Sequence, residues 1–342
     1  MRKLLALAIL IACFIPGIGA GEESTTSGPA AVSARGPSTQ LGIGGHPQTL
    51  DRRRLAATQR TSRLAMDPRM SALPGAQDPD IRQLWELALS LEDRGERKKA
   101  ASVYESIAPH IQFSAAAHWR IARMHWRIGD LMPNNEIKGS GAYAQYRIAE
   151  SWARRGLEID EKCAECMLWL YAALGRITVS EGLLSGVKYA RTMSTLLDDG
   201  IALQPSYRDS DINSTLGNLY YARAIFNRMV PDWWWLGILV GVRGDREQAL
   251  RDIDYALALN GNRIDYQVEK GAVLMCLGST RSREQRIEEG RVVLREAMTF
   301  ERRFETDELD LQLAQQMIET PEKACGFTRE GFVDVAGEAK KL

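Results

Sequence analysis

The sequence predicts an all-α fold: a solenoid of about five helical hairpins, with extended turns inside the hairpins and a capping helix near the carboxyl end. Three observations predict it. Apolar residues recur at helical spacing from Ile81 to about Thr320. Small residues recur in this stretch where paired helices must approach each other closely. The spacing between successive hairpins is almost constant, whereas the spacing inside a hairpin varies.

The small residues follow the pattern of the tetratricopeptide repeat (TPR), a unit of about 34 residues with two helices, A and B. The stretch Leu216-Gly217-x-x-Tyr220 matches the L-G-x-x-Y part of its helix A signature. The small helix A positions are Ala88, Ala122, Ala172, Gly217 and Gly271. The corresponding helix B positions are Ala100, Ala149, Met193, Ala249 and Gly290.

The spacings between these positions separate the joints from the turns. From each helix B position to the next helix A position the gaps are 22, 23, 24 and 22 residues. Within a unit they are 12, 27, 21, 32 and 19 residues, where a TPR has roughly 12. We therefore expect the extra residues to enter the turn inside each unit and to project from one edge of the array. Close packing is expected at Ala122/Ala149 and at Gly217/Ala249.

Helix ends are expected at residues that favour a chain reversal. Pro205 follows helix B of the third unit, because it has no N–H with which to continue the helix. Residues 305–320 form the last amphipathic pattern, which predicts the capping helix. Residues 321–342 are expected to form a loosely ordered tail. Glycines that we expect to end helix A stand at Gly95, Gly129, Gly244 and Gly278.

The amino-terminal segment has the pattern of an export signal. Arg2 and Lys3 precede an apolar run from Leu4 to Ile15, which is too short to cross a bilayer as a helix of about 20 residues. We expect a signal peptide over residues 1–20. The protein is then periplasmic or secreted.

Two forms of the exported protein remain open. The stretch Leu10-Ile11-Ala12-Cys13 is similar to a bacterial lipobox, so Cys13 is a candidate lipidation site. Cleavage near Ala20 would instead release the protein without an anchor. Residues 21–79 are rich in Ser, Thr, Gly, Pro and Ala, without apolar periodicity. They predict a disordered spacer before the repeat domain of residues 80–320.

Charge and motifs argue against several functions. The 44 basic and 44 acidic residues cancel, so no overall field attracts nucleic acid, and we expect no nucleic-acid binding. The P-loop, dinucleotide, H-E-x-x-H and G-x-S-x-G motifs are absent from the sequence. His118 and His125 would lie about 10.5 Å apart along a helix, too far to share a metal. We therefore expect neither catalysis nor a cofactor nor a metal.

Aromatic residues are the candidate binding residues. Trp233, Trp234 and Trp235 would point about 100° apart on a helix, so one core cannot cover all three from one side. At least one is expected to face a groove, a partner or a membrane interface, and the alternative is burial of all three under neighbouring insertions. A second group is expected on the concave surface of the array, with packing between helices as the alternative. It comprises Trp119, Trp126, Trp169, Tyr220 and Tyr221.

Four cysteines follow the predicted signal peptide. Cys163 and Cys166 stand at a joint between units, where a local disulfide and two buried free thiols are both open. A thioredoxin-like role is not expected, since no strand–helix–strand pattern surrounds them. Pairing of Cys276 with Cys325 would tie the tail to the last unit.

Part of the chain resembles a known family. The stretch 143–277 contains Gly156-Leu157-Glu158-Ile159-Asp160, Cys163-Ala164-Glu165-Cys166 and Gly244-Asp245-Arg246-Glu247-Gln248-Ala249. It resembles the T-component of tripartite ATP-independent periplasmic (TRAP) transporters, and is also similar to the microtubule-dynamics-regulator group of TPR proteins. The first resemblance implies a periplasmic lipoprotein that associates with a solute-binding subunit and holds a small hydrophobic solute. The alternative is an adaptor of a cell-envelope complex, with protein partners and no small ligand.

Overall fold

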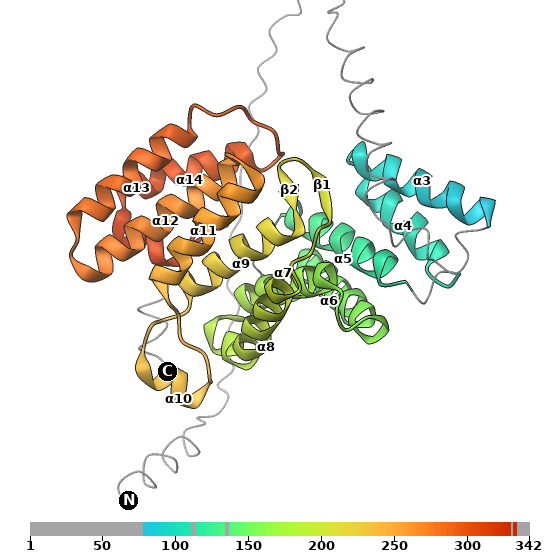
Figure 1. The fold of residues 1–342 in the computed structure, drawn as a ribbon, viewed down its shortest axis with the longest axis horizontal. Coiled ribbons are helices and arrows are strands. Elements are labelled where there is room, and N and C mark those ends of the chain that lie inside the picture. Colours follow the sequence, from blue (N-terminus) through green and yellow to red (C-terminus); the bar gives the residue numbers. More distant parts are fainter. Residues whose placement is uncertain (1–77, 111–113, 134–136, 330, 334–342) are drawn as a thin grey trace, which may run out of the picture. The chain divides into compact units, whose positions relative to one another are not determined.

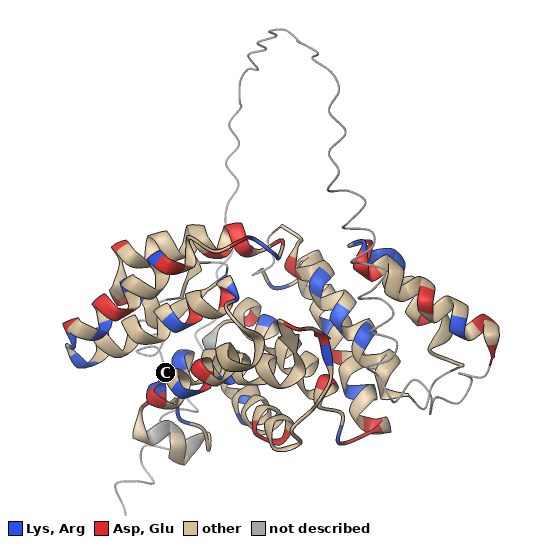
Figure 2. Ribbon diagram, turned by 45° about the horizontal axis from the view of Figure 1, so that its top comes forward, with Lys and Arg blue, Asp and Glu red and all other residues tan. Residues whose placement is uncertain are grey.

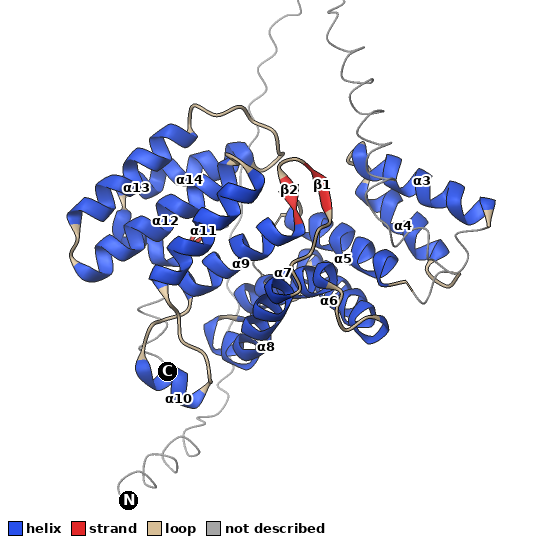
Figure 3. Ribbon diagram, in the orientation of Figure 1, coloured by secondary structure: helices blue, strands red, loops and turns tan. Residues whose placement is uncertain are grey.

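The computed structural model describes residues 78–110, 114–133, 137–329 and 331–333. The expected signal peptide, Cys13 and the spacer up to residue 77 lie outside the described residues. The described part contains twelve α-helices and two short antiparallel hairpins (Figures 1 and 3). None of these helices is both long enough and apolar enough to cross a membrane.

Ten of the helices form five antiparallel pairs, each made of helices that follow one another or are separated by one short helix. The pairs are α3 (Pro79–Asp93) with α4 (Arg97–Ile107), α5 (Ala115–Asp130) with α6 (Gly141–Ile159), α7 (Ala164–Glu181) with α8 (Leu183–Ala202), α9 (Thr215–Met229) with α11 (Arg246–Asn260), and α12 (Ile264–Arg281) with α13 (Glu284–Ala297) (Figure 1). In every pair, the first helix contains a predicted helix A position and the second contains the matching helix B position. The predicted fold class is confirmed.

Polar side chains fix where several helices begin. Ser114 caps α5 by accepting a hydrogen bond from the Ala116 N–H, and Ser214 caps α9 by accepting one from the Gly217 N–H. Asp245 caps α11 in the same way, through the Gln248 N–H. Such a side-chain oxygen satisfies an N–H that the helix itself leaves unpaired.

The four glycines expected to end helix A act differently. Gly95 follows α3 with φ +73°, as expected of a residue after a helix end. Gly129 and Gly278 instead lie inside the last turns of α5 and α12. A Cβ on Gly129 would stand 2.7 Å from the Tyr146 ring, so its small size serves helix packing. Gly244 precedes α11, where a Cβ would collide with the Val230 carbonyl oxygen.

The expected contact between Gly217 and Ala249 is wrong. α9 and α11 are paired, but a Cβ on Gly217 would collide with the side chain of Asn260, at 2.6 Å from its Cγ. Ala249 stands eleven positions before Asn260, about 16 Å along the helix. In the last pair the prediction holds, since a Cβ on Gly290 would lie 3.0 Å from the Gly271 carbonyl oxygen.

The extra residues of the units go to two places. Between α5 and α6, and between α9 and α11, they lengthen the turn, and the second of these turns contains α10 (Trp234–Leu239). Only Gly182 separates α7 from α8, so the third unit uses its extra residues in helices of 18 and 20 residues. The joint before α9 contains the β1 (Arg208–Ser210) and β2 (Asn213–Ser214) hairpin.

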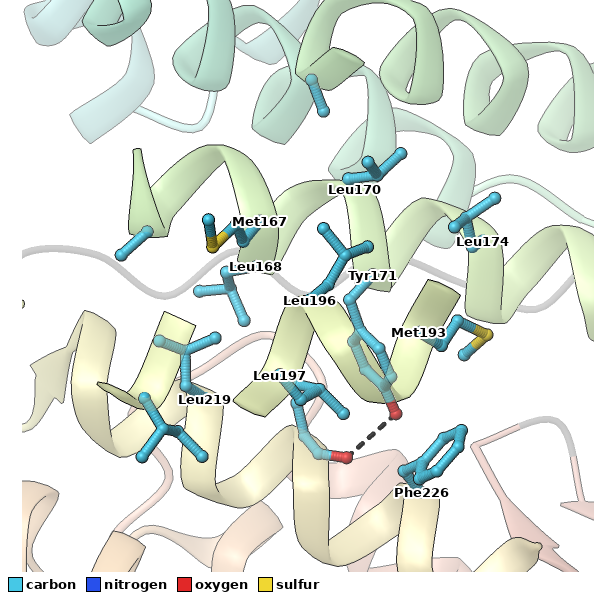
Figure 4. Close-up of a cluster of buried hydrophobic side chains, with 14 of the residues drawn as sticks. Met167, Leu168, Leu170, Tyr171, Leu174, Met193, Leu196, Leu197, Leu219 and Phe226 are labelled. Atoms are coloured by element: carbon cyan, nitrogen blue, oxygen red, sulfur yellow. Dashed lines mark hydrogen bonds between the residues drawn. The ribbon is translucent and has the colours of Figure 1, made fainter. Parts of the chain in front are cut away.

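The core beneath the middle of the array lies between α7, α8 and α9. Leu174, Leu197 and Leu219 are fully buried there. Figure 4 shows this cluster, in which the Tyr171 hydroxyl donates a hydrogen bond of 2.9 Å to the Ala222 carbonyl oxygen. The phenol therefore enters the core with its polar group satisfied.

The expected capping helix is present as α14 (Asp307–Glu319), which packs Ala314 and Met317 into the core of the last pair. Of the tail that was expected to be loosely ordered, the structure describes residues 321–329 and 331–333. They form a 3-10 helix, η2 (Pro321–Gly326), and the antiparallel strands β3 (Phe327–Thr328) and β4 (Gly331–Phe332). Buried apolar side chains and a disulfide to α12 hold this part of the tail in place.

Candidate binding cavity

A cavity of about 590 Å³ opens among the helices of the array. Its wall is formed mainly by residues of α5, α7, α8, α9 and α12. Arg97 of α4, the β1–β2 hairpin, the segments on both sides of α10 and the stretch from residue 303 to Arg329 also contribute. The exposed part of this wall is mostly apolar. A volume between roughly 300 and 1,000 Å³ with a mostly apolar lining is typical of sites for small molecules.

The apolar part of the wall comes mainly from α7, α8 and α9. Leu168, Met193 and Ile225 line it, and Phe226 is buried behind the same face. Val242, between α10 and α11, completes this side. These side chains offer no hydrogen-bonding groups, so they favour an apolar ligand surface.

The charged part of the wall comes mainly from α5, the β1–β2 hairpin, α12, α14 and the tail. Its arginines already have carboxylate partners: Arg263 pairs with Asp265 at 2.7 Å and Arg329 with Asp310 at 2.8 Å. The charged residues that line the cavity are eight arginines and seven carboxylates, which leaves a formal charge of +1. Figure 2 shows acidic and basic residues interspersed along these helices.

Two ion pairs of this wall join distant parts of the chain. Arg97, at the start of α4, pairs with Glu305, which stands 208 positions later and just before α14. Asp130, at the end of α5, lies 3.6 Å from the Arg329 guanidinium. The first two hairpins therefore contact the carboxyl-terminal part of the array directly.

Arg123 illustrates how the ion pairs within the wall are built. Its guanidinium forms a salt bridge of 2.6 Å with Glu92 and a second one with Asp209. Burial alone would lower the pKa of Arg123, but the carboxylates of Asp209 and Glu92 raise that pKa above its ordinary value. The neighbouring Tyr207 donates a hydrogen bond of 2.7 Å to Asp209, and burial raises the pKa of this phenol to about 12.

Four of the five aromatic residues expected on the concave surface line the cavity: Trp119, Trp126, Trp169 and Tyr221. The rings of Trp126 and Trp169 lie 5.7 Å apart, and the Trp126 indole donates to the Ala172 carbonyl oxygen. Trp119 is almost fully buried beneath Arg120. It therefore serves as core as well as wall.

Tyr220 does not line the cavity. It stacks on Tyr255 of α11, with ring centroids 5.3 Å apart. Tyr221, its neighbour in the chain, stacks on Tyr266 of α12 at 4.6 Å and faces the cavity. Successive helix residues point about 100° apart, which separates the two phenols.

The described side chains of the tryptophan run are not part of this wall, although Pro231 and Val240 on either side of the run line it. Trp233 is half-buried and Trp234 is exposed, and neither lines the cavity. The side chain of Trp235 lies outside the described ones. The sequence predicted two separate groups of aromatic candidates, and of the described side chains only members of the second group line the cavity.

The four described cysteines form two disulfides, Cys163–Cys166 and Cys276–Cys325. Cys163 is the N-cap residue of α7, and both sulfurs of the first bridge belong to fully buried residues. Burial restricts exchange with other thiols, because exchange requires access to a sulfur. The second bridge joins η2 to α12.

His118 and His125, one helical heptad apart on α5, have different hydrogen-bond partners. His118 Nδ1 lies 2.8 Å from the Ser114 carbonyl oxygen. His125 contacts Gln145 at 2.7 Å and Glu105 at 3.0 Å. Within the described residues, no cluster of three or more His, Cys, Asp or Glu side chains could hold a metal ion.

Sequence reasoning missed the charged part of the wall. No local pattern marked Asp209, Asp310 and Arg329, because their ion-pair partners stand at least 19 positions away in the chain. Arg123 and Asp209, for example, are separated by 86 positions. A charged residue within an otherwise apolar helix face is the local pattern that can indicate a buried ion pair. Arg228 of α9 is such a residue.

One family model matches part of this chain. The family model described as regulator of microtubule dynamics protein 1-3 matches residues 84–228, which extend from α3 to α9. The fold is a TPR-like array of helical hairpins. A comparison with curated proteins finds no match. The resemblance to the TRAP T-component stays a prediction.

Among solved structures, a thermophilic TPR protein from Thermus thermophilus is similar to this chain. The TM-score is 0.46 at 15% identity, over 70% of this chain and 99% of that chain.

Proposed function

We propose that the protein is a non-catalytic binding scaffold whose cavity holds a small, largely apolar solute with one acidic group. The cavity of about 590 Å³, apolar along α7, α8 and α9, is the observation that carries this proposal. Its apolar wall would supply most of the affinity, because burying apolar surface is the main favourable contribution. Each arginine of the wall has five N–H donors, so an arginine that is paired with a carboxylate can still donate to one negative group of a ligand.

The wider role that we propose is an accessory component of a solute uptake system. The sequence resemblance to the TRAP T-component and the expected export signal support it, and the apolar cavity is the kind of site that such a role needs. The solute-binding subunit of the transporter would then be the protein partner. The alternative is an envelope adaptor in which the cavity receives apolar side chains of a protein partner.

A cavity-filling substitution tests the proposal. Gly175 lines the cavity in α7, and a Cβ there would have only the Met193 terminal carbon near it, at 3.9 Å. Gly175→Phe should therefore fill the cavity without a clash against backbone. Val292→Phe, on an exposed position of α13, is the matched control.

The probe is a fluorescent medium-chain fatty acid, titrated into the full chain after removal of co-purified lipid. We expect saturable binding, about tenfold or more weaker in Gly175→Phe and unchanged in Val292→Phe. Native mass spectrometry of untreated protein should show a bound small molecule. Equal binding by both variants would contradict the cavity as the site. A wild-type protein without bound ligand and without affinity for the probe would favour the adaptor.

A further inference from the structure

The turn that contains α10 carries an unusual apolar surface. From Trp233 to Val242 the sequence has ten consecutive residues without a charge. Trp234 is 71% exposed and Ile238 is 72% exposed, the highest values among the large apolar side chains of the described residues. The two stand four positions apart on α10 and therefore share one side of it. Neighbouring apolar side chains that are this exposed form a patch of the kind that marks an interaction site.

Two arginines flank this surface. The Cδ of Arg191, on α8, lies 4.0 Å from the Cβ position of Gly241, and the Cβ of Arg243 lies 3.9 Å from that of Gly237. Both arginines are exposed, and neither has an ion-pair partner within the described part of the chain. Their positive charge is thus available to a ligand.

The acidic residue nearest in sequence does not cancel this charge. Asp232 precedes the tryptophan run, but it pairs with Arg246 at 2.9 Å. The whole chain has no net charge, so the positive charge beside α10 is a local property. An exposed tryptophan, an apolar neighbour and unpaired arginines together are the features of segments that bind at the surface of anionic membranes.

We propose that the α10 turn docks on an anionic lipid surface. Trp234 and Ile238 would enter the boundary between headgroups and acyl chains, where an indole ring is favoured. Arg191 and Arg243 would lie against the lipid phosphates. The helix has only six residues, so it would lie on the membrane and not cross it. This inference does not depend on the cavity or its ligand.

Charge complementarity favours a lipid surface over a protein groove as the binding partner of the α10 turn. A protein groove that received Trp234 and Ile238 would be apolar, and the two flanking arginines would add nothing to it unless acidic residues faced them. An anionic membrane supplies both an apolar interior and a dense layer of phosphates within one surface. Because the contact is small, binding should be weak, reversible and sensitive to salt.

Vesicle co-sedimentation tests the proposal. The full chain carrying Cys13→Ser, which excludes lipid modification, would be mixed with vesicles of phosphatidylcholine alone or with phosphatidylglycerol added. Two variants in this background, Trp234→Ser/Ile238→Ser and Arg191→Glu/Arg243→Glu, remove the apolar and the basic part separately. The matched control is Tyr255→Ser/Val292→Ser, which removes two exposed apolar side chains on α11 and α13.

We expect the parent chain to bind the phosphatidylglycerol vesicles and to bind phosphatidylcholine alone much less. Each of the two α10-surface variants should weaken binding about tenfold or more, whereas the control should bind as the parent does. Circular dichroism would establish that all variants fold. The proposal is overturned if the parent chain binds both kinds of vesicle equally well, or if either α10-surface variant binds as tightly as the control. Capture of a protein at this surface without vesicle binding would also overturn it.

Discussion

Arg228 and Glu269 form a bidentate salt bridge, with N–O distances of 2.7 and 2.9 Å, although each side chain is only 1% exposed. The pair joins α9 to α12, and so joins the fourth hairpin to the fifth. The same guanidinium donates hydrogen bonds of 3.0 Å to the carbonyl oxygens of Ala324, Cys325 and Phe327. One buried side chain therefore also fixes the tail.

Replacing Arg228 by methionine should destabilise the fold strongly. The change leaves the Glu269 carboxylate buried without its partner and removes the donor from three carbonyl oxygens. We expect a loss of about 3–5 kcal/mol in the free energy of unfolding, measured with urea by circular dichroism. Arg251→Met, at an exposed arginine of α11, should lose no more than about 0.5 kcal/mol. The double change Arg228→Met/Glu269→Met should cost less than Arg228→Met alone.

The two disulfides should differ in their effect on stability. Cys276 and Cys325 are separated by 49 positions, and Cys163 and Cys166 by three. A bridge restricts the unfolded chain more when it closes a longer loop, which predicts about 4 kcal/mol for the first and about 2 kcal/mol for the second. Urea unfolding of the two double alanine variants would measure this. The opposite order would show that native packing around Cys163 matters more than loop length.

Gly217 should tolerate no side chain. A Cβ would stand 2.6 Å from the Asn260 Cγ, and Asn260 cannot move freely because it accepts hydrogen bonds from Ser214 and donates one to Tyr266. We expect Gly217→Ala to cost about 1–3 kcal/mol, and Gly217→Leu more. Gly175→Ala is the control, with ordinary contacts and a helical position where alanine gains about 0.5–1 kcal/mol. Equal melting temperatures for the two alanine variants would contradict this packing.

His118 should make stability depend on pH. Burial lowers the pKa of this imidazole; the hydrogen bond to the Ser114 carbonyl opposes the shift, and the charge of Arg155 adds to it. A histidine whose folded pKa is below its unfolded value, about 6.5, stabilises the fold above that pH. This contribution is lost as the pH falls through the folded pKa.

The measurement is the free energy of unfolding between about pH 8 and about pH 5, for the wild type and His118→Gln. The advantage of the wild type should shrink towards the acidic end. His110→Gln, at an exposed position, is the matched control. Parallel curves for the wild type and His118→Gln would rule out a titrating His118 as the cause.

The fold could be predicted because its signals are local. Helix pairs repeat along the chain, and each contacts mainly its neighbours, so spacing between small residues was sufficient to find five of them. The register within a pair was less accessible. Gly217 meets Asn260 and not Ala249, because sixteen residues separate α9 from α11 and this long turn shifts one helix along the other.

The tail could not be predicted for a related reason. Ala324 and Phe327 are too few to give an apolar period, and their carbonyl oxygens accept hydrogen bonds from Arg228, almost a hundred positions earlier. In the cavity, the aromatic candidates were found because they recur in helix A. The direction in which each ring points could not be predicted, because Tyr220 and Tyr221 are neighbours in the chain and face different sides of α9.

The ion pairs Arg97–Glu305 and Asp130–Arg329 have a consequence for how a ligand reaches the cavity. In an open array each repeat touches only its neighbours, so the whole can bend and widen freely. Here the two pairs hold the early and late hairpins together across the cavity wall. Because salt screens the attraction within these pairs, the array should widen more readily at high salt, and a bulky guest should then enter faster.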